Sequence, residues 1–262
     1  IDTTIDLLDS YCRPFIANIL PALLNACLNG PKLLAGADYF AQGTTSLAGY
    51  FQGTVHVSDA FRLVGGIRYS DDTKDGGIVQ INRNAAELFH GNETTALALE
   101  ESRFTYRGAV EYDVSPDIFV FASYSTGFKS GGFNSSFSRT NLGQSRIFNA
   151  ETVANYDVGI RSQFLDRRVT ANVTLYRMDI DGVQERGFDG LQFTTRNVGS
   201  LRQQGVEFDL STRPIRDVIL GVSGAYLDSE YTSYRNAPNL PGLPGTQDLT
   251  GTRANFSPKW QG

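Results

Sequence analysis

A regular alternation of hydrophobic and polar residues begins at Leu47. From there to Tyr226, apolar and polar side chains alternate with a period of two in a series of short segments. This period is typical of strands that have one apolar and one polar face. It predicts about eight strands, at 47–57, 61–70, 104–114, 118–127, 154–164, 169–175, 206–211 and 218–226.

The connections between these segments alternate between short and long. Short turns are expected at Ser58-Asp59, Ser115–Asp117, Leu165–Arg168 and Arg213–Asp217. Long polar loops are expected at 71–102, 128–150, 182–202 and after 226. All short turns therefore lie at one end of the sheet. A soluble β-sandwich also alternates, but this division of turns and loops is typical of an outer-membrane barrel. The predicted fold is all-β, an antiparallel transmembrane β-barrel.

The apolar faces of these segments carry no charge through their middles. In strand 104–114, a slip of one residue would move Arg107, Glu111 and Asp113 onto the apolar face. A basic residue at the centre of a bilayer costs roughly 2–4 kcal/mol, and acidic residues cost less. The register of each strand is therefore strongly specified if lipid covers the apolar face.

Residues 1–44 lack this alternation. Ile16, Ile19, Leu20, Leu23 and Leu24 have helical spacing, but Pro14 and Pro21 interrupt it. We expect an extracellular loop segment with short helices over 1–44.

The two cysteines, Cys12 and Cys27, lie in this segment. In an oxidising compartment they could form a disulfide that closes the loop, and the alternative is a pair of buried free thiols. A single straight helix would hold them roughly 22 Å apart, too far for a bond. A broken helical segment would allow it.

Composition narrows the function classes. Charged residues make up 19% of the chain and the net charge is −5, so we expect no nucleic-acid partner. No catalytic motif or metal-ligand spacing was found, and we expect neither an enzyme nor a cofactor. Residues 1–10 lack the basic start and cleavage site of a signal peptide, which predicts a mature or cut fragment.

Several local motifs together carry a family resemblance. They are Phe121–Asn134 (FASYSTGFKSGGFN), Phe148–Val153, Tyr156–Gly159, Leu165–Arg168, Asn197–Gly199, Gly205–Phe208 and Phe256–Trp260. Gly49–Asp72 is similar to an earlier hairpin of the same barrel. The motifs resemble the barrel of a TonB-dependent outer-membrane receptor over about residues 45–262.

The resemblance implies a 22-stranded barrel filled by an N-terminal plug, of which 45–262 would be a partial, internal fragment. The plug and the TonB box would lie outside this chain. The implied function is uptake of a scarce nutrient, such as a ferric siderophore, across the cell outer membrane. The implied partners are outer-membrane lipid, the small-molecule ligand and, through the plug, the TonB complex. The alternatives are a passive porin-like or structural barrel, and a soluble β-sandwich binding module.

The stretch Phe119–Asn134 runs from a strand into a long loop. Since the Ser115–Asp117 turn precedes it, the strand begins on the periplasmic side and Gly131-Gly132 are extracellular. Phe128, Lys129, Phe133 and Asn134 would then sit at the outer lip, where they could contact a ligand or pack the loop. Inward residues such as Arg161 and Glu207 are expected to line a hydrated wall.

Overall fold

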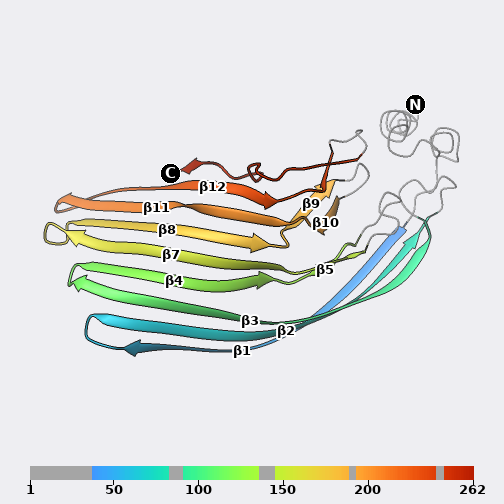
Figure 1. Ribbon diagram of the computed structural model, residues 1–262, viewed down its shortest axis with the longest axis horizontal. Coiled ribbons are helices and arrows are strands. Elements are labelled where there is room, and N and C mark those ends of the chain that lie inside the picture. The colour runs from blue at the N-terminus through green and yellow to red at the C-terminus, as the bar shows by residue number, and fades with distance from the viewer. Residues whose placement is uncertain (1–36, 83–90, 136–144, 189–192, 240–244) are drawn as a thin grey trace.

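The main element of the structure is one antiparallel sheet of nine strands, which lie side by side in Figure 1. A computed structural model describes residues 37–82, 91–135, 145–188, 193–239 and 245–262. The strands, in spatial order, are β1 (Ala37–His56), β2 (Phe61–Ile81), β3 (Glu93–Ser115), β4 (Ile118–Lys129), β7 (Glu151–Phe164), β8 (Val169–Asp181), β11 (Ser200–Ile215), β12 (Val218–Ser233) and β15 (Trp260–Gln261).

The predicted strands are confirmed, and β15 adds one that the alternation did not reveal. Each strand pairs with the next one along the sheet, and the predicted short turns join β1 to β2, β3 to β4, β7 to β8 and β11 to β12. These turns all lie at the left end of Figure 1, and the long connections lie at the other end. The predicted division between a turn end and a loop end is therefore confirmed.

One row of paired residues crosses the whole sheet on a single face, which we call the outer face. The row consists of Val55, Leu63, Val110, Ala122, Val158, Leu175, Val206, Tyr226 and Trp260. Val158 and Leu175 are 57% and 52% exposed. Soluble monomers rarely expose a continuous apolar patch of this kind. The outer face is therefore the face suited to contact with lipid.

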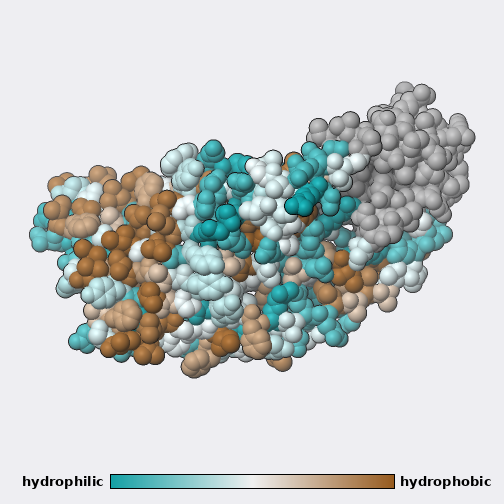
Figure 2. Space-filling model, in the orientation of Figure 1, coloured by the Kyte–Doolittle hydropathy of each residue, from teal (hydrophilic) through white to brown (hydrophobic). Residues whose placement is uncertain are grey.

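Aromatic rings mark the loop-side limit of this apolar face. The ring of Tyr124 lies 5.9 Å from that of Tyr106 and 4.9 Å from that of Tyr156, between centroids. Beside Tyr156, the outer face of β8 becomes charged at Arg177. The view in Figure 2 agrees, because hydrophobic surface gathers toward the turn end and hydrophilic surface toward the loop end. Such rings are typical of the membrane–water interface.

The opposite, inner face is polar, and some of its charges are paired. The Arg62 Nε lies 3.1 Å from a Glu111 carboxylate oxygen, and the Arg62 guanidinium also pairs with Asp113. Two aromatic rings of β4 also lie on this face. The guanidinium of Arg62 lies over the Phe119 ring, and that of Arg161 lies 5.2 Å from the centroid of Phe121. Cation–π contacts of this kind stabilise an aromatic ring beside water.

The predicted loop at 71–102 is wrong over most of its length. β2 continues to Ile81 and β3 begins at Glu93, and the two strands pair residue by residue through this region. The prediction failed because this part of the two strands lies beyond the apolar part of the outer face. Both faces can be polar there, so the alternation that indicates a membrane strand is lost.

The predicted boundary at residue 44 is also displaced. β1 begins at Ala37 and pairs with β2 from there, so 37–44 form strand and not loop. Cys12, Cys27 and the short helices predicted before Ala37 lie outside the described residues. The described part of the chain contains no helix long and apolar enough to span a membrane.

The long connections fold into small sheets at the loop end. These are β5 (Gly132–Phe133) with β6 (Ile147–Phe148), β9 (Gln184–Phe188) with β10 (Phe193–Asn197), and β13 (Ala237–Pro238) with β14 (Thr246–Gln247). The buried hydrophobic clusters lie at this end too. One contains Ile78, Leu97 and Phe133, and another contains Val183, Leu201, Tyr231, Tyr234, Ala237 and Ala254. The sheet therefore has its packed cores beyond the apolar belt.

The substitution Val173→Arg tests the outer face, since Val173 lies midway along the apolar part of β8. We expect a loss of about 2–4 kcal/mol in the free energy of unfolding in lipid. Asn172→Arg is the matched control, because the neighbouring residue lies on the inner face beside the Asp209 carboxylate. Unfolding in lipid vesicles by denaturant measures both. An equal loss in the two variants would contradict the assignment of the faces.

Candidate functional site

Two glycines follow β4 where the chain passes close to Phe148. A Cβ atom on Gly131 would lie 2.4 Å from the carbonyl oxygen of Phe148, and one on Gly132 would lie 2.7 Å from the Phe148 ring. Atoms essentially never approach this closely. Gly131 therefore has to be glycine, whereas a side chain at Gly132 would require the Phe148 ring to move. The glycines thus allow β5 to pair with β6.

Phe133 is placed by this pairing in a small core, where it is 8% exposed. It packs with Ile78 and Leu97 on the inner side of the β2–β3 extension, and its ring lies over Gly76. Burying a phenylalanine contributes roughly 1.5–3 kcal/mol. The side chain therefore attaches the loop to the wall, and its ring is not presented at the lip.

Polar contacts hold the same loop against the wall. The Lys74 ammonium donates to the Gly131 carbonyl oxygen, and a Glu101 carboxylate oxygen accepts from the Gly131 N–H at 3.2 Å. The buried Arg146 guanidinium donates to both Glu93 carboxylate oxygens, at 3.0 and 2.6 Å, and to the Gln80 side-chain oxygen. The loop is thereby tied to β2 and β3 on both sides of β5.

Asn134 joins the loop to a second element, β10. Its side-chain nitrogen donates to the Thr195 carbonyl oxygen at 2.9 Å, and its side-chain oxygen accepts from the Thr195 N–H at 2.7 Å. The amide thus pairs with Thr195 as a strand neighbour would. Asn134 is 8% exposed, so the structure places it inside the loop assembly.

Phe128 and Lys129 are the last two residues of β4, just before this assembly. Strand alternation places Phe128 on the outer face with Tyr124, whereas Lys129 is exposed at the last position of the strand. The structure therefore does not bring the predicted lip residues into one site. A ligand contact by Lys129 stays a prediction.

Two amide side chains connect β4, β7 and the β9–β10 hairpin. The Gln184 side-chain nitrogen donates to the carbonyl oxygens of Ser130 at 3.1 Å and Asn149 at 2.9 Å. The Asn197 side-chain nitrogen donates to the carbonyl oxygens of Asn149 at 2.9 Å and Gly182 at 2.7 Å. These bonds give the hairpin a defined position above the wall.

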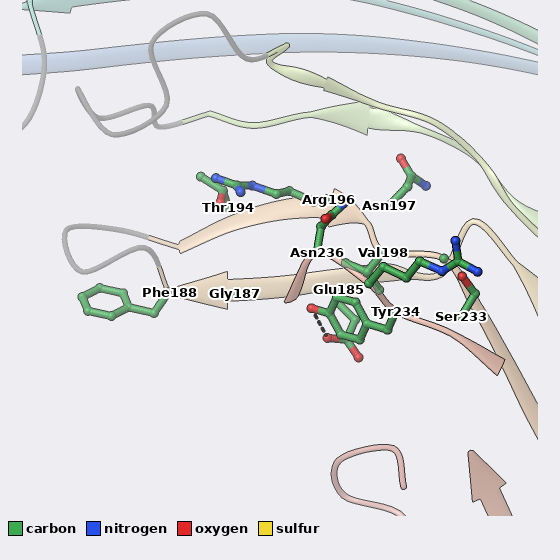
Figure 3. A pocket seen from close by; sticks show the side chains of 12 residues that line it. Glu185, Gly187, Phe188, Thr194, Arg196, Asn197, Val198, Ser233, Tyr234 and Asn236 are labelled. Carbon is green, nitrogen blue, oxygen red and sulfur yellow. Dashed lines mark hydrogen bonds between the residues drawn. The ribbon is translucent and has the colours of Figure 1, made fainter. Parts of the chain in front are cut away.

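A cavity of about 470 Å³ lies between this hairpin and the end of β12. Its size falls in the range of small-molecule pockets. Its lining combines aromatic, basic and carboxyl side chains, as Figure 3 shows for most of them. The lining residues are Glu185, Gly187, Phe188, Thr194, Arg196, Asn197, Val198, Gly199, Ser233, Tyr234, Arg235 and Asn236. We call this cavity the hairpin pocket.

Glu185 and Tyr234 face each other in the hairpin pocket. The Tyr234 hydroxyl lies 3.4 Å from a Glu185 carboxylate oxygen, and Figure 3 marks this hydrogen bond. Burial raises the pKa of the Glu185 carboxyl, and burial together with the nearby Glu185 charge raises the pKa of Tyr234 to about 12. Tyr234 therefore remains a neutral hydrogen-bond donor at physiological pH.

Tyr234 owes its position to the cluster beneath the pocket. Its ring packs edge-on against Tyr231, with centroids 5.0 Å apart, beside Leu201 and Ala254. Its N–H donates to the Thr250 hydroxyl oxygen at 2.9 Å, and its carbonyl oxygen accepts from the Leu249 N–H at 2.8 Å. The hydroxyl is thus held by packing and by backbone bonds.

Sequence reasoning missed the hairpin pocket. The sequence pattern predicts a loop over 182–202, and it gives Tyr234 no feature that separates it from other tyrosines in long connections. The available signal was the occurrence of Phe188, Arg196, Tyr234 and Arg235 in long connections, because aromatic and arginine side chains are common in binding sites. No group of three or more metal-binding side chains occurs among the described residues.

Comparison with known proteins decides the family. The family model described as "TonB dependent receptor-like, beta-barrel" matches residues 17–262. The chain belongs to this family. It is thus an outer-membrane protein, and TonB-dependent receptors are transporters and not enzymes.

Individual relatives agree with this assignment. The chain is 26% identical to the pesticin receptor of Yersinia enterocolitica over 212 residues, which are 80% of this chain and 30% of that protein. Its fold is similar to that of the ferric yersiniabactin uptake receptor FyuA from Yersinia pestis, with a TM-score of 0.68, 21% identity, and coverage of 86% of this chain and 31% of that one.

A further solved structure with this fold is the siderophore receptor PiuA from Acinetobacter baumannii. The TM-score is 0.66 and the identity 16%, with coverage of 84% of this chain and 30% of that one. The chain spans about a third of the length of each TonB-dependent receptor that it matches here.

The substitution Gly131→Ala tests the close approach in the loop of this receptor segment. We expect the β5–β6 pair to loosen by about 1–3 kcal/mol, since the new Cβ atom overlaps the Phe148 carbonyl oxygen. Hydrogen exchange of the β5 and β6 amides measures the change. Gly77→Ala is the control, because no atom lies within 4 Å of its Cβ position. Equal exchange in both variants would refute the close approach.

The substitution Asn134→Ala separates a loop role from a ligand role. Loss of the amide leaves the N–H and carbonyl of Thr195 without their partner, at a cost of about 1–3 kcal/mol. We expect faster hydrogen exchange in β10 without added ligand, whereas Lys129→Ala leaves that exchange unchanged. Unaltered exchange in Asn134→Ala combined with weaker ligand binding would assign Asn134 to the ligand instead.

Proposed function

We propose that this chain forms part of the barrel wall of an outer-membrane active transporter for ferric siderophores, driven by energy from TonB. The observation that carries the proposal is the two-faced wall. A lipid-facing apolar belt backs a polar inner face, and folded loops surround a pocket at the extracellular end. The receptors to which the chain is similar are named for a ferric siderophore or for siderophores.

The partners follow from this proposal. Outer-membrane lipid contacts the outer face through the row that includes Val158 and Leu175. A ferric siderophore enters from the loop end. The TonB complex acts through a plug that lies outside this chain. Each of these partners is part of the proposal.

The alternative functions fit the wall less well. A soluble β-sandwich buries apolar faces between two stacked sheets, whereas the apolar row here is exposed on a single sheet. A passive porin-like barrel would share the two-faced wall. Only its independence of TonB would distinguish it from an active transporter.

Uptake of radiolabelled iron tests this function. A strain that lacks the full gene should lose uptake of the cognate ferric siderophore, and the gene on a plasmid should restore it. The same plasmid in a strain without TonB should restore no uptake, because active import needs that energy. Uptake that persists without TonB would indicate a passive barrel, and uptake that never depends on the gene would refute the proposal.

A further inference from the structure

An apolar groove lies on the outer face, where β11, β12 and β15 run side by side. Its volume is about 410 Å³, and it is lined by Val206, Phe208, Tyr226 and Trp260, none of which carries a charge. Val206 pairs with Tyr226, and Tyr226 pairs with Trp260, in the apolar row that crosses the sheet. The groove is therefore a hollow within the apolar belt, and we call it the belt groove.

A glycine on β12 determines the shape of one side of the belt groove. Gly224 is the register partner of Phe208, and a Cβ atom on it would lie 2.7 Å from the Phe208 ring. The ring therefore extends across the glycine toward β12. On the other side, the Trp260 ring lies 4.9 Å from that of Tyr226 between centroids, and Trp260 is 70% exposed. Aromatic rings thus form both walls of the groove.

The belt groove lies at the loop-side limit of the belt. Two residues further toward the loop end on each strand, the Gln204 side-chain nitrogen donates to an Asp228 carboxylate oxygen at 3.3 Å on the same face. Tyr226 is therefore the last apolar residue of β12 before the outer face becomes polar. Tyrosine and tryptophan are typical of this boundary between lipid and water. A lipid at this height has its headgroup beside Gln204 and Asp228 and its chains over the groove.

Packing, and not hydrophobicity, distinguishes the groove from the rest of the belt. Lipid chains are as apolar as the groove lining, so burial by itself favours no position along the belt. An empty hollow, however, forfeits the dispersion contacts of the side chains that line it. A chain seated between two aromatic walls makes those contacts on both sides. A chain beside a protruding side chain such as Val158 makes them on one side only.

We propose that the belt groove binds one acyl chain of an outer-membrane lipid from the leaflet at the loop end. The chain lies between the Phe208 and Trp260 rings, and the polar headgroup lies at the row that contains Gln204 and Asp228. Elsewhere on the belt, lipid chains exchange freely. The site is separate from the hairpin pocket, and it is the same whichever substrate the receptor transports.

The apolar row provides a matched control. Val158 lies in the same row as Val206, through Leu175, but it does not line the groove. Val206→Phe places an additional ring in the groove, whereas Val158→Phe adds the same ring elsewhere on the belt. Trp260→Ala is a second test variant, because it removes one wall of the groove and fills nothing.

Photochemical cross-linking of a lipid to the full-length receptor in vesicles tests the proposal. The probe is a phosphatidylethanolamine with a diazirine in one acyl chain, and mass spectrometry identifies the labelled residues. In the wild type, we expect at least about threefold more label at Tyr226 than at Val158. Val206→Phe and Trp260→Ala should each remove this excess, and Val158→Phe should retain it. Equal labelling of the two positions in the wild type overturns the proposal, as does an excess that survives in either groove variant.

The position of the diazirine along the chain tests the orientation of the lipid. A diazirine close to the headgroup should label Tyr226, whereas one at the end of the chain should label residues nearer the turns, such as Phe208 and Leu220. The reverse order would place the headgroup at the turn end, and it would overturn the assignment to the leaflet at the loop end.

Discussion

The constraint on which this structure depends is that each wall strand has one apolar and one polar face, as a strand between lipid and a polar interior requires. Lipid offers no hydrogen-bond partner, so each backbone N–H and C=O in the belt must pair with a neighbouring strand. Side chains then alternate with the pairing, and the register of one strand sets that of the next. The row from Val55 to Trp260 stays apolar across the sheet because a slip at any strand would bring its polar set into lipid.

Beyond the aromatic rings this constraint no longer applies, and other interactions stabilise the structure. The β2–β3 pair continues past the membrane, held by its own ladder of backbone hydrogen bonds. Ile78 and Leu97 lie on the inner face there, and Phe133 packs on them. Loops that would otherwise be mobile are held by amide side chains, as Asn134 holds β10 through Thr195. The loop end is therefore a small folded unit that rests on the wall.

The polar side chains of the loop end serve mainly to hold the fold together. Most polar side chains of the loop end are occupied by backbone groups or by ion pairs, as Gln184 and Arg146 illustrate. In the hairpin pocket, Arg196 lies opposite Glu185 in the β9–β10 pair, and the Glu185 carboxylate accepts a hydrogen bond from the Tyr234 hydroxyl. The polar groups that line the pocket are thus held in place by their neighbours within the fold.

The alternation of residues was sufficient to predict the wall: its strands, its short turns and the identity of its lipid face. It was sufficient because lipid imposes the same period on each strand, and that period is local in sequence. The motif around Phe121–Asn134 also indicated the right family. The strand extensions and the hairpin pocket required the folded structure. Beyond the apolar belt, water can contact both faces of a strand, so the sequence need not alternate there. Contacts such as those of Asn134 with Thr195 and Glu185 with Tyr234 also join residues far apart in the chain. The local sequence around Phe133 does not distinguish a ligand-binding role from a role in a core. Only its packing over Gly76 in the folded structure does so.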